Sequence, residues 1–410
     1  MTLSDIYGPY ADKTLFKSRV NKLTEIYKEK VHKVPEYVFS SSGRAEICGN
    51  HTDHNHGEVI VAAISCDILA AVGKSEDGVI RIYSEGFAPF CVNVDETEVV
   101  RAEYGKSIAL VRGVVKAVKD RGYKVGGFTA VSDSTVFRGA GVSSSAAFEL
   151  LIAEILNVLY LDGALGKVEK AIISQYAENI YFGKPCGLLD QSGISLGGIN
   201  KIDFKDPESP VIESLSAPEG YTLVITNTGG SHATLTEHYA AINSEMHDVA
   251  RCFGKEFLRD VGEDEFYDSI SSVRRKTSDR AVLRACHFYE ENKRVEVGAI
   301  ALRRGDIRTF LESIQKSGES SLNCLQNCFV PGSCEQPVSL ALHISDRIIK
   351  DGAVRLHGGG FAGTILAYLS DAEKDGYAFE MAKLFGEENV FKASVREPGA
   401  VCLDVRALSE

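Results

Sequence analysis

Residues 139–159 read GAGVSSSAAFELLIAEILNVL, a turn of small residues that runs directly into an apolar repeat. Apolar side chains recur there at three- and four-residue intervals with polar ones between them, the pattern of an amphipathic helix. The repeat comprises Phe148, Leu151, Ile152, Ile155, Leu156 and Leu159. It predicts a helix from Ala146 onward, and the serines before it are natural N-caps.

A glycine-rich turn that opens a helix is suited to binding phosphate. The first N–H groups of a helix have no partner within it, and the helix dipole places partial positive charge at that end. The serine hydroxyls add donors or a ligand for Mg²⁺. A helix cap made of small residues explains the turn equally well. No GK[ST] follows the glycines, so the turn is not a Walker A loop.

A second glycine turn, HGGGFAG at residues 357–363, fits the G-x-G-x-x-G pattern of dinucleotide-binding proteins. That pattern follows a strand and opens a helix, whereas this turn is predicted to follow a helix and a short segment, GAVRL. It then leads into TILAYL, a predicted strand at Thr364–Leu369. The context therefore disfavours an oxidoreductase.

Residues 43–57, GRAEICGNHTDHNHG, are predicted to form one polar loop before the apolar VIVAAIS segment. So many directional donors and acceptors suit a ligand with several hydroxyl groups. A solvated loop or an adventitious metal site is the alternative, although the HxDHNH spacing matches no standard zinc pattern. The polar residues are Arg44, Asn50, His51, Asp53, His54, Asn55 and His56.

Asp190 lies in PCGLLDQSGISLGG, residues 185–198, just before a stretch predicted to be a loop rich in serine and glycine. An aspartate in a loop is commonly a cap or turn residue. The functional alternative is a carboxylate that takes a hydroxyl proton during phosphoryl transfer.

The 410 residues favour two domains over three, and the proline-containing segment after residue 204 suggests a boundary near Lys205. The predicted domains are residues 1–204 and 205–410. Strands and helices are mixed without strict alternation, so the expected class is α+β. Two further helices are predicted, at Lys13–Lys33 and around Ala378–Phe385, and the region Tyr239–Lys350 is predicted to be mostly helical. Three further strands are predicted: one that begins at Tyr37, one at Tyr221–Thr226 and a last one near Val401.

The net charge is −12, without a run of Lys and Arg that could follow a nucleic-acid backbone. No segment approaches the roughly 20 apolar residues of a membrane span. Ten cysteines without an apparent leader fit a reducing cytoplasm. Cys324, Cys328 and Cys334 are expected to be free thiols, since their spacing lacks a second metal-binding pair.

Together and in this order, the four motifs resemble the GHMP kinases. GNHTDHN is similar to the GEHTDYN signature of galactokinases, and PCGLLDQ is similar to their PCGIMDQ segment. The resemblance implies a two-domain fold of mixed sheets layered with helices and an active site in the cleft between the domains. It also implies an ATP- and Mg²⁺-dependent sugar 1-kinase that forms α-D-galactose 1-phosphate.

The resemblance implies roles for individual residues. Asp190 corresponds to the catalytic carboxylate facing the C1 hydroxyl, and Arg44 to the group that stabilises charge beside it. Ser145 and Glu178 resemble the Mg²⁺ ligands. The phosphate loop includes Gly139, Gly141, Ser143, Ser144 and Ser145, and the matching sugar-binding positions are Asn50, His51, Asp53, Gly187 and Tyr239.

The chain departs from the galactokinase pattern in ways that affect the expected substrate. Asn50 replaces a glutamate expected to meet the C6 hydroxyl, His54 replaces a tyrosine, SSSGR replaces APGR, and Ala362 replaces a glycine. Kinases of galacturonate, N-acetylgalactosamine or arabinose are therefore alternatives. A non-catalytic sugar sensor is disfavoured because the SSSAA run, Arg44 and Asp190 are all present. No adenine-pocket residue is predicted, and a monomer is the default expectation.

Overall fold

The computed structural model describes the chain except residues 137–140, 230–234, 362, 406–407 and 409–410. Its described part contains a sheet of eight strands in the order β12-β1-β2-β5-β3-β4, with β6 attached to β2 and β7 to β6. The parallel pairing of β3 with β5 makes this sheet mixed, as predicted. Its strands are β1 (Tyr37–Cys48), β2 (Glu58–Ser75), β3 (Val79–Ser84), β4 (Phe90–Asn93), β5 (Gly127–Ser134), β6 (Ile199–Asp203), β7 (Val211–Leu215) and β12 (Val401–Leu403).

The described residues form a second, four-stranded antiparallel sheet in the order β11-β8-β10-β9. Leu223 and Ile225 of β8 enter the main core, while Val224 between them packs in a separate cluster. Both faces of this sheet are therefore covered, which explains the continuous apolar run YTLVIT. Its strands are β8 (Tyr221–Asn227), β9 (Gly352–His357), β10 (Thr364–Ser370) and β11 (Val390–Ala393).

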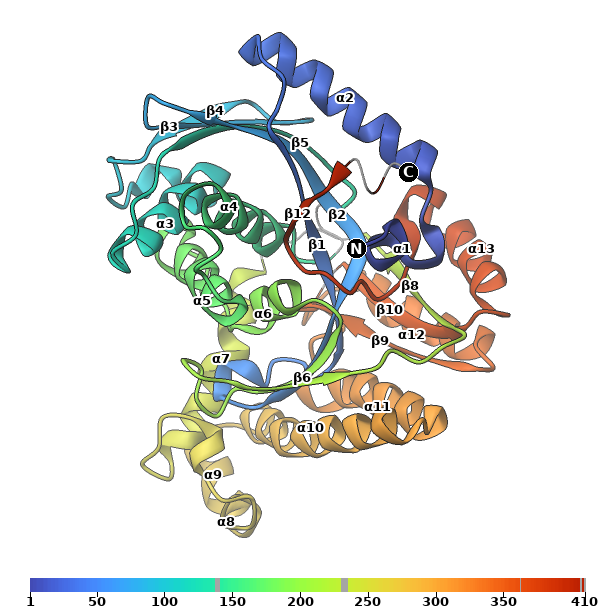
Figure 1. The fold of residues 1–410 in the computed structure, drawn as a ribbon. Coiled ribbons are helices and arrows are strands. Elements are labelled where there is room, and N and C mark those ends of the chain that lie inside the picture. The colour runs from blue at the N-terminus through green and yellow to red at the C-terminus, as the bar shows by residue number, and fades with distance from the viewer. Residues whose placement is uncertain (137–140, 230–234, 362, 406–407, 409–410) are drawn as a thin grey trace.

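The longer helices form layers against the two sheets (Figure 1). Helices α3 to α6 gather on one face of the larger sheet and α2 crosses the other, whereas α11 to α13 pack around the smaller sheet. These helices are α2 (Lys13–Val31), α3 (Ser107–Asp120), α4 (Ser144–Tyr160), α5 (Lys167–Tyr176), α6 (Leu189–Leu196), α7 (Thr236–Arg251), α10 (Asp279–Arg304), α11 (Ile307–Ser320), α12 (Pro337–Ile348) and α13 (Lys374–Phe385). Shorter ones are α1 (Leu3–Tyr7), α8 (Glu263–Asp268) and α9 (Ile270–Lys276).

The following predicted elements are confirmed: the helix at Lys13, the helix after the serines, strands β8 and β10, the helical region before residue 350, and the last helix and strand. The second glycine turn joins β9 to β10 as a hairpin, and β9 itself is a strand that pairs along its length with β10. The turn therefore opens no helix. The predicted boundary near Lys205 stays a prediction; it falls between β6 and β7, which pair with each other in the larger sheet.

Two expectations about loops are wrong. The stretch from Gly43 to Cys48 is not a loop, because β1 continues to Cys48 and pairs with β2 throughout. Its two charged side chains have partners inside the protein, because Arg44 pairs with Asp190 and Glu46 pairs with Arg355, so a polar run is buried as a strand. Asp190 also lies outside a loop, in the first turn of α6, whose Leu189 and Ile194 are buried.

Among the described residues, none of the helices combines the length and the apolar character needed to cross a membrane.

The end of β1 is fastened to the helical region by one buried carboxylate, Glu291 of α10. Its Oε1 accepts the backbone N–H of Gly49 at 2.8 Å, and its Oε2 accepts Nε of Arg294 at 2.7 Å. Burial would raise its pKa, but His287, Arg294 and Arg355 outweigh burial and lower it to about 2. Glu291 is therefore ionised in the folded protein and supports the loop after β1.

We expect Glu291→Gln to lower the free energy of unfolding at pH 7 by about 3 kcal/mol, because it removes a buried negative charge that offsets the charges of Arg294 and Arg355. The folded pKa is lowered from 4.5 to about 2, so the stabilisation is present above pH 4.5 and is lost as the pH falls toward 2. Urea unfolding should show the gap between wild type and variant shrinking from pH 7 to pH 3. The neighbouring Glu290→Gln, which removes a more exposed partner of Arg294, is the control. A gap that stays constant with pH contradicts the assignment.

Candidate active site

Arg44 and Asp190 form a partly buried ion pair between β1 and α6. Both Nε and Nη2 of Arg44 lie 2.8 Å from Oδ1 of Asp190, and Nη1 donates to the backbone carbonyl of Gly141. The arginine side chain is only 5% exposed. The guanidinium is thus fixed by the carboxylate on one side and by the predicted phosphate loop on the other.

Asp190 is held in its ionised form. Its second oxygen, Oδ2, accepts the hydroxyl of Ser143. Burial opposes ionisation, but Arg44, Ser143 and the ammonium of Lys184 together lower the pKa of Asp190 below its usual value. A carboxylate in this state can accept a proton from a hydroxyl group placed against it.

The predicted phosphate loop meets both of these residues at the start of α4. Ser143 has a left-handed backbone, with φ 62°, and stands at the N-cap position. Its side chain makes no capping bond, contrary to the expected cap, because the hydroxyl serves Asp190 instead. The first turn of α4 begins with Ser144 and Ser145, so the end of a 17-residue helix faces this loop. Gly139 lies outside the described residues.

The two glycine turns pack against each other. Gly141 has φ 64°, and an added Cβ there would lie 3.3 Å from the carbonyl oxygen of His357. At Gly358, with φ 73°, an added Cβ would lie 3.2 Å from the carbonyl oxygen of Gly141. The backbones approach this closely only because both residues are glycine. Ala362 lies outside the described residues.

The two residues predicted to hold Mg²⁺ are in contact. Ser145 Oγ donates to Oε1 of Glu178 at 2.9 Å, and Gln191 Nε2 donates to its Oε2 at 2.8 Å. Lys184 Nζ lies 3.0 Å from the same Oε1 atom. Glu178, in the π-helical turn Ala177–Phe182 after α5, is itself almost fully buried.

A third carboxylate, Glu149 of α4, lies beside this pair. Its Oε2 accepts Gln191 Nε2 at 3.3 Å, while its buried Oε1 has no hydrogen-bond partner among the described residues. Burial, and then the nearby Glu178, raise its pKa well above the usual value. No group of three His, Cys, Asp or Glu among the described residues could hold a metal ion. A hydroxyl with a carboxylate fits Mg²⁺, which takes few protein ligands beside phosphate and water.

Two of the predicted sugar-binding residues, Asp53 and Gly187, lie together at the N-terminus of α6. Asp53 Oδ2 accepts the backbone N–H of Leu189 at 3.2 Å, next to Asp190. A Cβ added at Gly187 would lie 1.8 Å from the same oxygen, so any side chain there would displace the Asp53 carboxylate. His51 donates Nε2–H to the carbonyl of Gly359 at 3.0 Å, and burial lowers its pKa to about 3, which keeps it neutral.

Tyr239 of α7 contacts the second glycine turn, as His51 does. Its hydroxyl donates to the carbonyl of Gly360 at 3.0 Å, and its ring lies 5.5 Å from that of Phe361 at an angle of 84°. The chain thus brings Tyr239 to the turn that also binds His51. Residues separated by almost 200 positions in the sequence meet at one turn.

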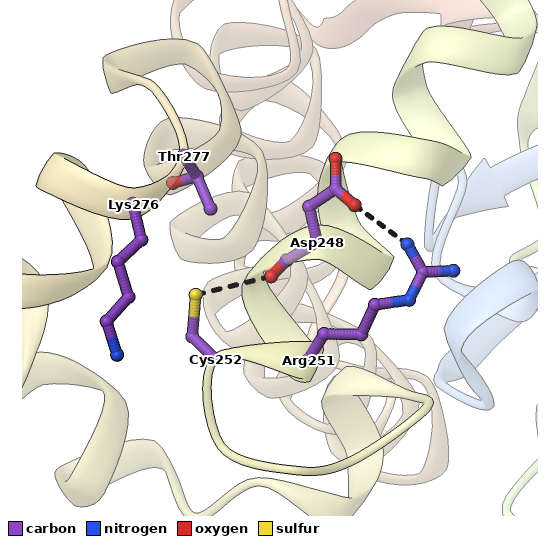
Figure 2. Close-up of a pocket in the computed structure, with 5 residues that line it drawn as sticks. All are labelled: Asp248, Arg251, Cys252, Lys276 and Thr277. Atoms are coloured by element: carbon purple, nitrogen blue, oxygen red, sulfur yellow. Dashed lines mark hydrogen bonds and ion pairs between the residues drawn. The ribbon is translucent and has the colours of Figure 1, made fainter.

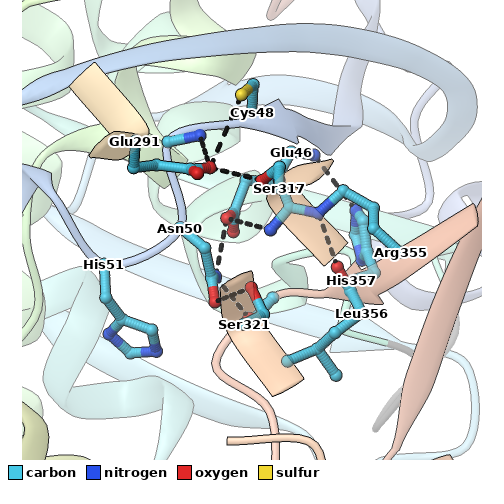
Figure 3. A network of polar contacts seen from close by, with 12 residues as sticks. Glu46, Cys48, Asn50, His51, Glu291, Ser317, Ser321, Arg355, Leu356 and His357 are labelled. Carbon is cyan, nitrogen blue, oxygen red and sulfur yellow. Dashed lines mark hydrogen bonds and ion pairs between the residues drawn. The ribbon is translucent and has the colours of Figure 1, made fainter. Parts of the chain in front are cut away.

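Asn50 also reaches the second glycine turn, but its amide is occupied in a buried network (Figure 3). The amide Nδ2 donates to Glu46 Oε1 at 2.6 Å and to the carbonyl of Gly358 at 3.0 Å. Its Oδ1 accepts Asn327 Nδ2 at 2.9 Å. Glu46 is paired in turn with Arg355 at 3.1 Å. Both ends of the Asn50 amide therefore bind the protein itself.

Four polar residues at the site were not predicted: Glu149, Lys184, Gln191 and Asn327. Lys184 and Gln191 flank the PCGLLD segment, so their position beside Asp190 was a usable signal. Glu149 sits one helical turn after Ser145, which places both on one face of α4. Asn327 lies in the part of the chain read only as mostly helical, and no local pattern pointed to it.

A separate hollow of about 480 Å³ lies at the end of α7, against α9 (Figure 2). Figure 2 shows two contacts among its labelled residues: the Asp248–Arg251 ion pair at 2.8 Å, and Cys252 Sγ donating to the carbonyl of Asp248. It shares none of the residues predicted for catalysis. We assign it no role.

Comparison with known proteins identifies the family. A family model described as the galactokinase galactose-binding signature matches residues 25–74, and one for the GHMP kinases N terminal domain matches residues 109–198. The first contains Arg44 and Asp53, and the second contains Ser143 and Asp190. Three of the four motifs therefore fall within matched segments, and the second glycine turn at residues 357–363 lies outside them.

Among solved structures, the fold resembles that of Lactococcus lactis galactokinase complexed with galactose, with a TM-score of 0.82 and 23% identity over 93% of this chain and 99% of that one. It also resembles Methanococcus jannaschii mevalonate kinase, with a TM-score of 0.61 and 14% identity over 87% and 98% of the two chains. These similarities establish the GHMP kinase fold.

In sequence, the chain is 32% identical over 339 residues to a galactokinase of Actinobacillus pleuropneumoniae serotype 5b (strain L20). The match covers 81% of this chain and 84% of that protein. With the two family models and the shared fold, this similarity shows that the chain belongs to the galactokinase family of the GHMP kinases.

Proposed function

We propose that the chain is a galactokinase, which transfers the γ-phosphoryl group of ATP to the anomeric C1 hydroxyl of D-galactose. The products are α-D-galactose 1-phosphate and ADP. The observation that carries the proposal is an ionised Asp190 fixed by Arg44 and Ser143 at the N-terminus of α4. This arrangement supplies a proton acceptor next to a site suited to phosphate.

In the proposed reaction, the C1 oxygen forms a bond to the γ-phosphorus while the bond from that phosphorus to the bridging oxygen of ADP breaks. The hydroxyl proton passes to Asp190. Arg44 stabilises negative charge on the attacking oxygen. Its hydrogen bond to the carbonyl of Gly141 fixes its position relative to the phosphate loop. Gly139, Gly141, Ser143 and Ser144 contribute to that loop.

Ser145 and Glu178 hold Mg²⁺ in this proposal. The ion neutralises charge on the phosphate oxygens when it is bound. The contact between the two side chains, at 2.9 Å, supports their joint role. Gln191, the residue after Asp190, donates a hydrogen bond to Glu178 and so links the proposed Mg²⁺ ligands to the catalytic carboxylate.

The sugar contacts His51, Asp53, Gly187 and Tyr239. Asp53 has carboxylate oxygens that can accept hydroxyl groups, and glycine at position 187 allows the chain to pack closely against its Oδ2. Asn50 was predicted to face the C6 substituent. Because its amide binds Glu46 and Gly358, we propose that it acts on the sugar through the glycine turn. The proposed enzyme works as a cytoplasmic monomer.

Asp190→Asn should lower kcat by at least about 10²-fold while galactose still binds, because the amide cannot accept the proton. A coupled ADP assay and calorimetry measure the two effects. Asp203→Asn is the matched control, because this aspartate is similarly exposed, at 22% against 27%, and also pairs with an arginine. An unchanged rate in Asp190→Asn removes it from the proposed role.

Among galactose, N-acetylgalactosamine, galacturonate and arabinose, galactose should give the highest kcat/KM. A buried group left unpaired by a poorly fitting sugar costs enough to discriminate strongly. The coupled ADP assay on the purified protein ranks the four sugars. If none is turned over above background while ATP still binds, the kinase proposal fails; if another sugar ranks first, only the substrate changes.

Glu178→Gln should raise the Mg²⁺ concentration needed for half-maximal activity by about 10-fold, because an anionic ligand of the hard cation becomes neutral. Binding of ADP measured with and without Mg²⁺ gives an independent readout. Glu169→Gln, which changes a more exposed glutamate on α5, is the control. An unaltered Mg²⁺ requirement assigns the ion to other ligands.

A further inference from the structure

Lys184 is a cation at the site that the proposed reaction does not yet use. It lies between the π-helical turn Ala177–Phe182 and α6, where Gly183 has φ 77° and reverses the chain. The backbone N–H of Lys184 donates to the carbonyl of Glu178 at 3.2 Å. The reversal directs the side chain back over the turn, and its Nζ reaches Glu178 Oε1 at 3.0 Å.

Lys184 and Arg44 differ in how many of their side-chain hydrogen-bond donors already bind groups of the protein. The Arg44 side chain is 5% exposed, and its Nε, Nη1 and Nη2 all contact Asp190 or the carbonyl of Gly141. The Lys184 side chain is 59% exposed, and one of the three donors of its ammonium goes to Glu178. Lys184 therefore retains donors for a ligand that enters the site from solvent.

The ammonium of Lys184 lies within electrostatic reach of both reacting sides. It contacts Glu178, which with Ser145 forms the proposed Mg²⁺ pair on the nucleotide side. It also contributes to lowering the pKa of Asp190, on the side of the sugar hydroxyl. In a transfer from nucleotide to sugar, the group that passes between these two sides is the γ-phosphoryl.

We propose that Lys184 is a second cationic catalytic residue, whose ammonium donates a hydrogen bond to the γ-phosphoryl group during transfer. The inference rests on the proposed function. Lys184 stays protonated throughout: the phosphorus–oxygen bonds exchange as described above, and the hydroxyl proton goes to Asp190. In the structure the ammonium pairs with Glu178; a Mg²⁺ ion held by that carboxylate would leave the ammonium free to bind the phosphoryl oxygens.

A purely structural role predicts different behaviour. An ion pair with one highly exposed partner contributes at most about 1 kcal/mol to stability. Its loss would leave the chemistry unchanged and would affect all nucleotides alike. Contact with the γ-phosphoryl instead makes Lys184 important for ligands that carry that group, and most important in the transition state.

The test compares Lys184→Met and Lys184→Arg with a control, Lys22→Met. This control removes an exposed lysine of α2 that is paired with Glu85. Kinetics with galactose and MgATP are combined with calorimetry of two ligands, Mg·ADP and Mg·AMP-PNP, an ATP analogue that is not hydrolysed. Thermal unfolding checks that each variant is folded.

For Lys184→Met, we expect kcat to fall about 10²-fold, as for loss of one preorganised donor, with the KM for galactose within about twofold of wild type. Affinity for Mg·AMP-PNP should fall about 10-fold, while affinity for Mg·ADP stays unchanged, because only the former carries a γ-phosphoryl group. Lys184→Arg should recover part of both losses, and Lys22→Met should match wild type.

The proposal is overturned if Lys184→Met keeps the wild-type kcat, or if Mg·ADP and Mg·AMP-PNP lose affinity equally. Either result alongside an inactive Asp190→Asn leaves the galactokinase proposal standing and rejects Lys184 alone. If the wild-type protein turns over no sugar, the kinase function fails, and the comparison of the two nucleotides still decides whether Lys184 contacts the γ-phosphoryl group.

Discussion

Two opposite charges are buried on one face of β1, and the rest of the structure depends on the groups that pair with them. Arg44 and Glu46 are two residues apart, so both side chains project to the same side of the strand. Arg44 pairs with Asp190 of α6, and Glu46 pairs with Arg355 of β9. An unpaired buried charge costs several kcal/mol, so β1 requires these partners from α6 and from β9.

These two pairs place the glycine turns where the chemistry is proposed. Arg44 also holds the carbonyl of Gly141, and Asn50 links Glu46 to the carbonyl of Gly358. The two turns then meet backbone to backbone, which a side chain at either glycine would hinder. The same contacts that satisfy buried charge therefore assemble the predicted phosphate loop, the second turn and the acceptor carboxylate at one place.

Local patterns were a good guide to some elements and a poor guide to others. The helix after the serines and strand β10 are visible because apolar periodicity reports burial directly. The strand through Arg44 and the helix at Asp190 were read as loops, because polar and small residues normally indicate exposure. Their polar groups are satisfied by partners far away in sequence, which no local pattern can reveal.

By itself, the sequence determined the family, the positions of the glycine turns and the residue types available for catalysis, because these depend on motifs contiguous in the chain. Only the tertiary structure decided that the pKa of Asp190 is lowered although burial opposes ionisation, that the Asn50 amide is occupied by the protein and that Lys184 contacts Glu178. Charge state and accessibility depend on burial and on neighbours brought in from distant segments, and those neighbours exist only once the chain has folded.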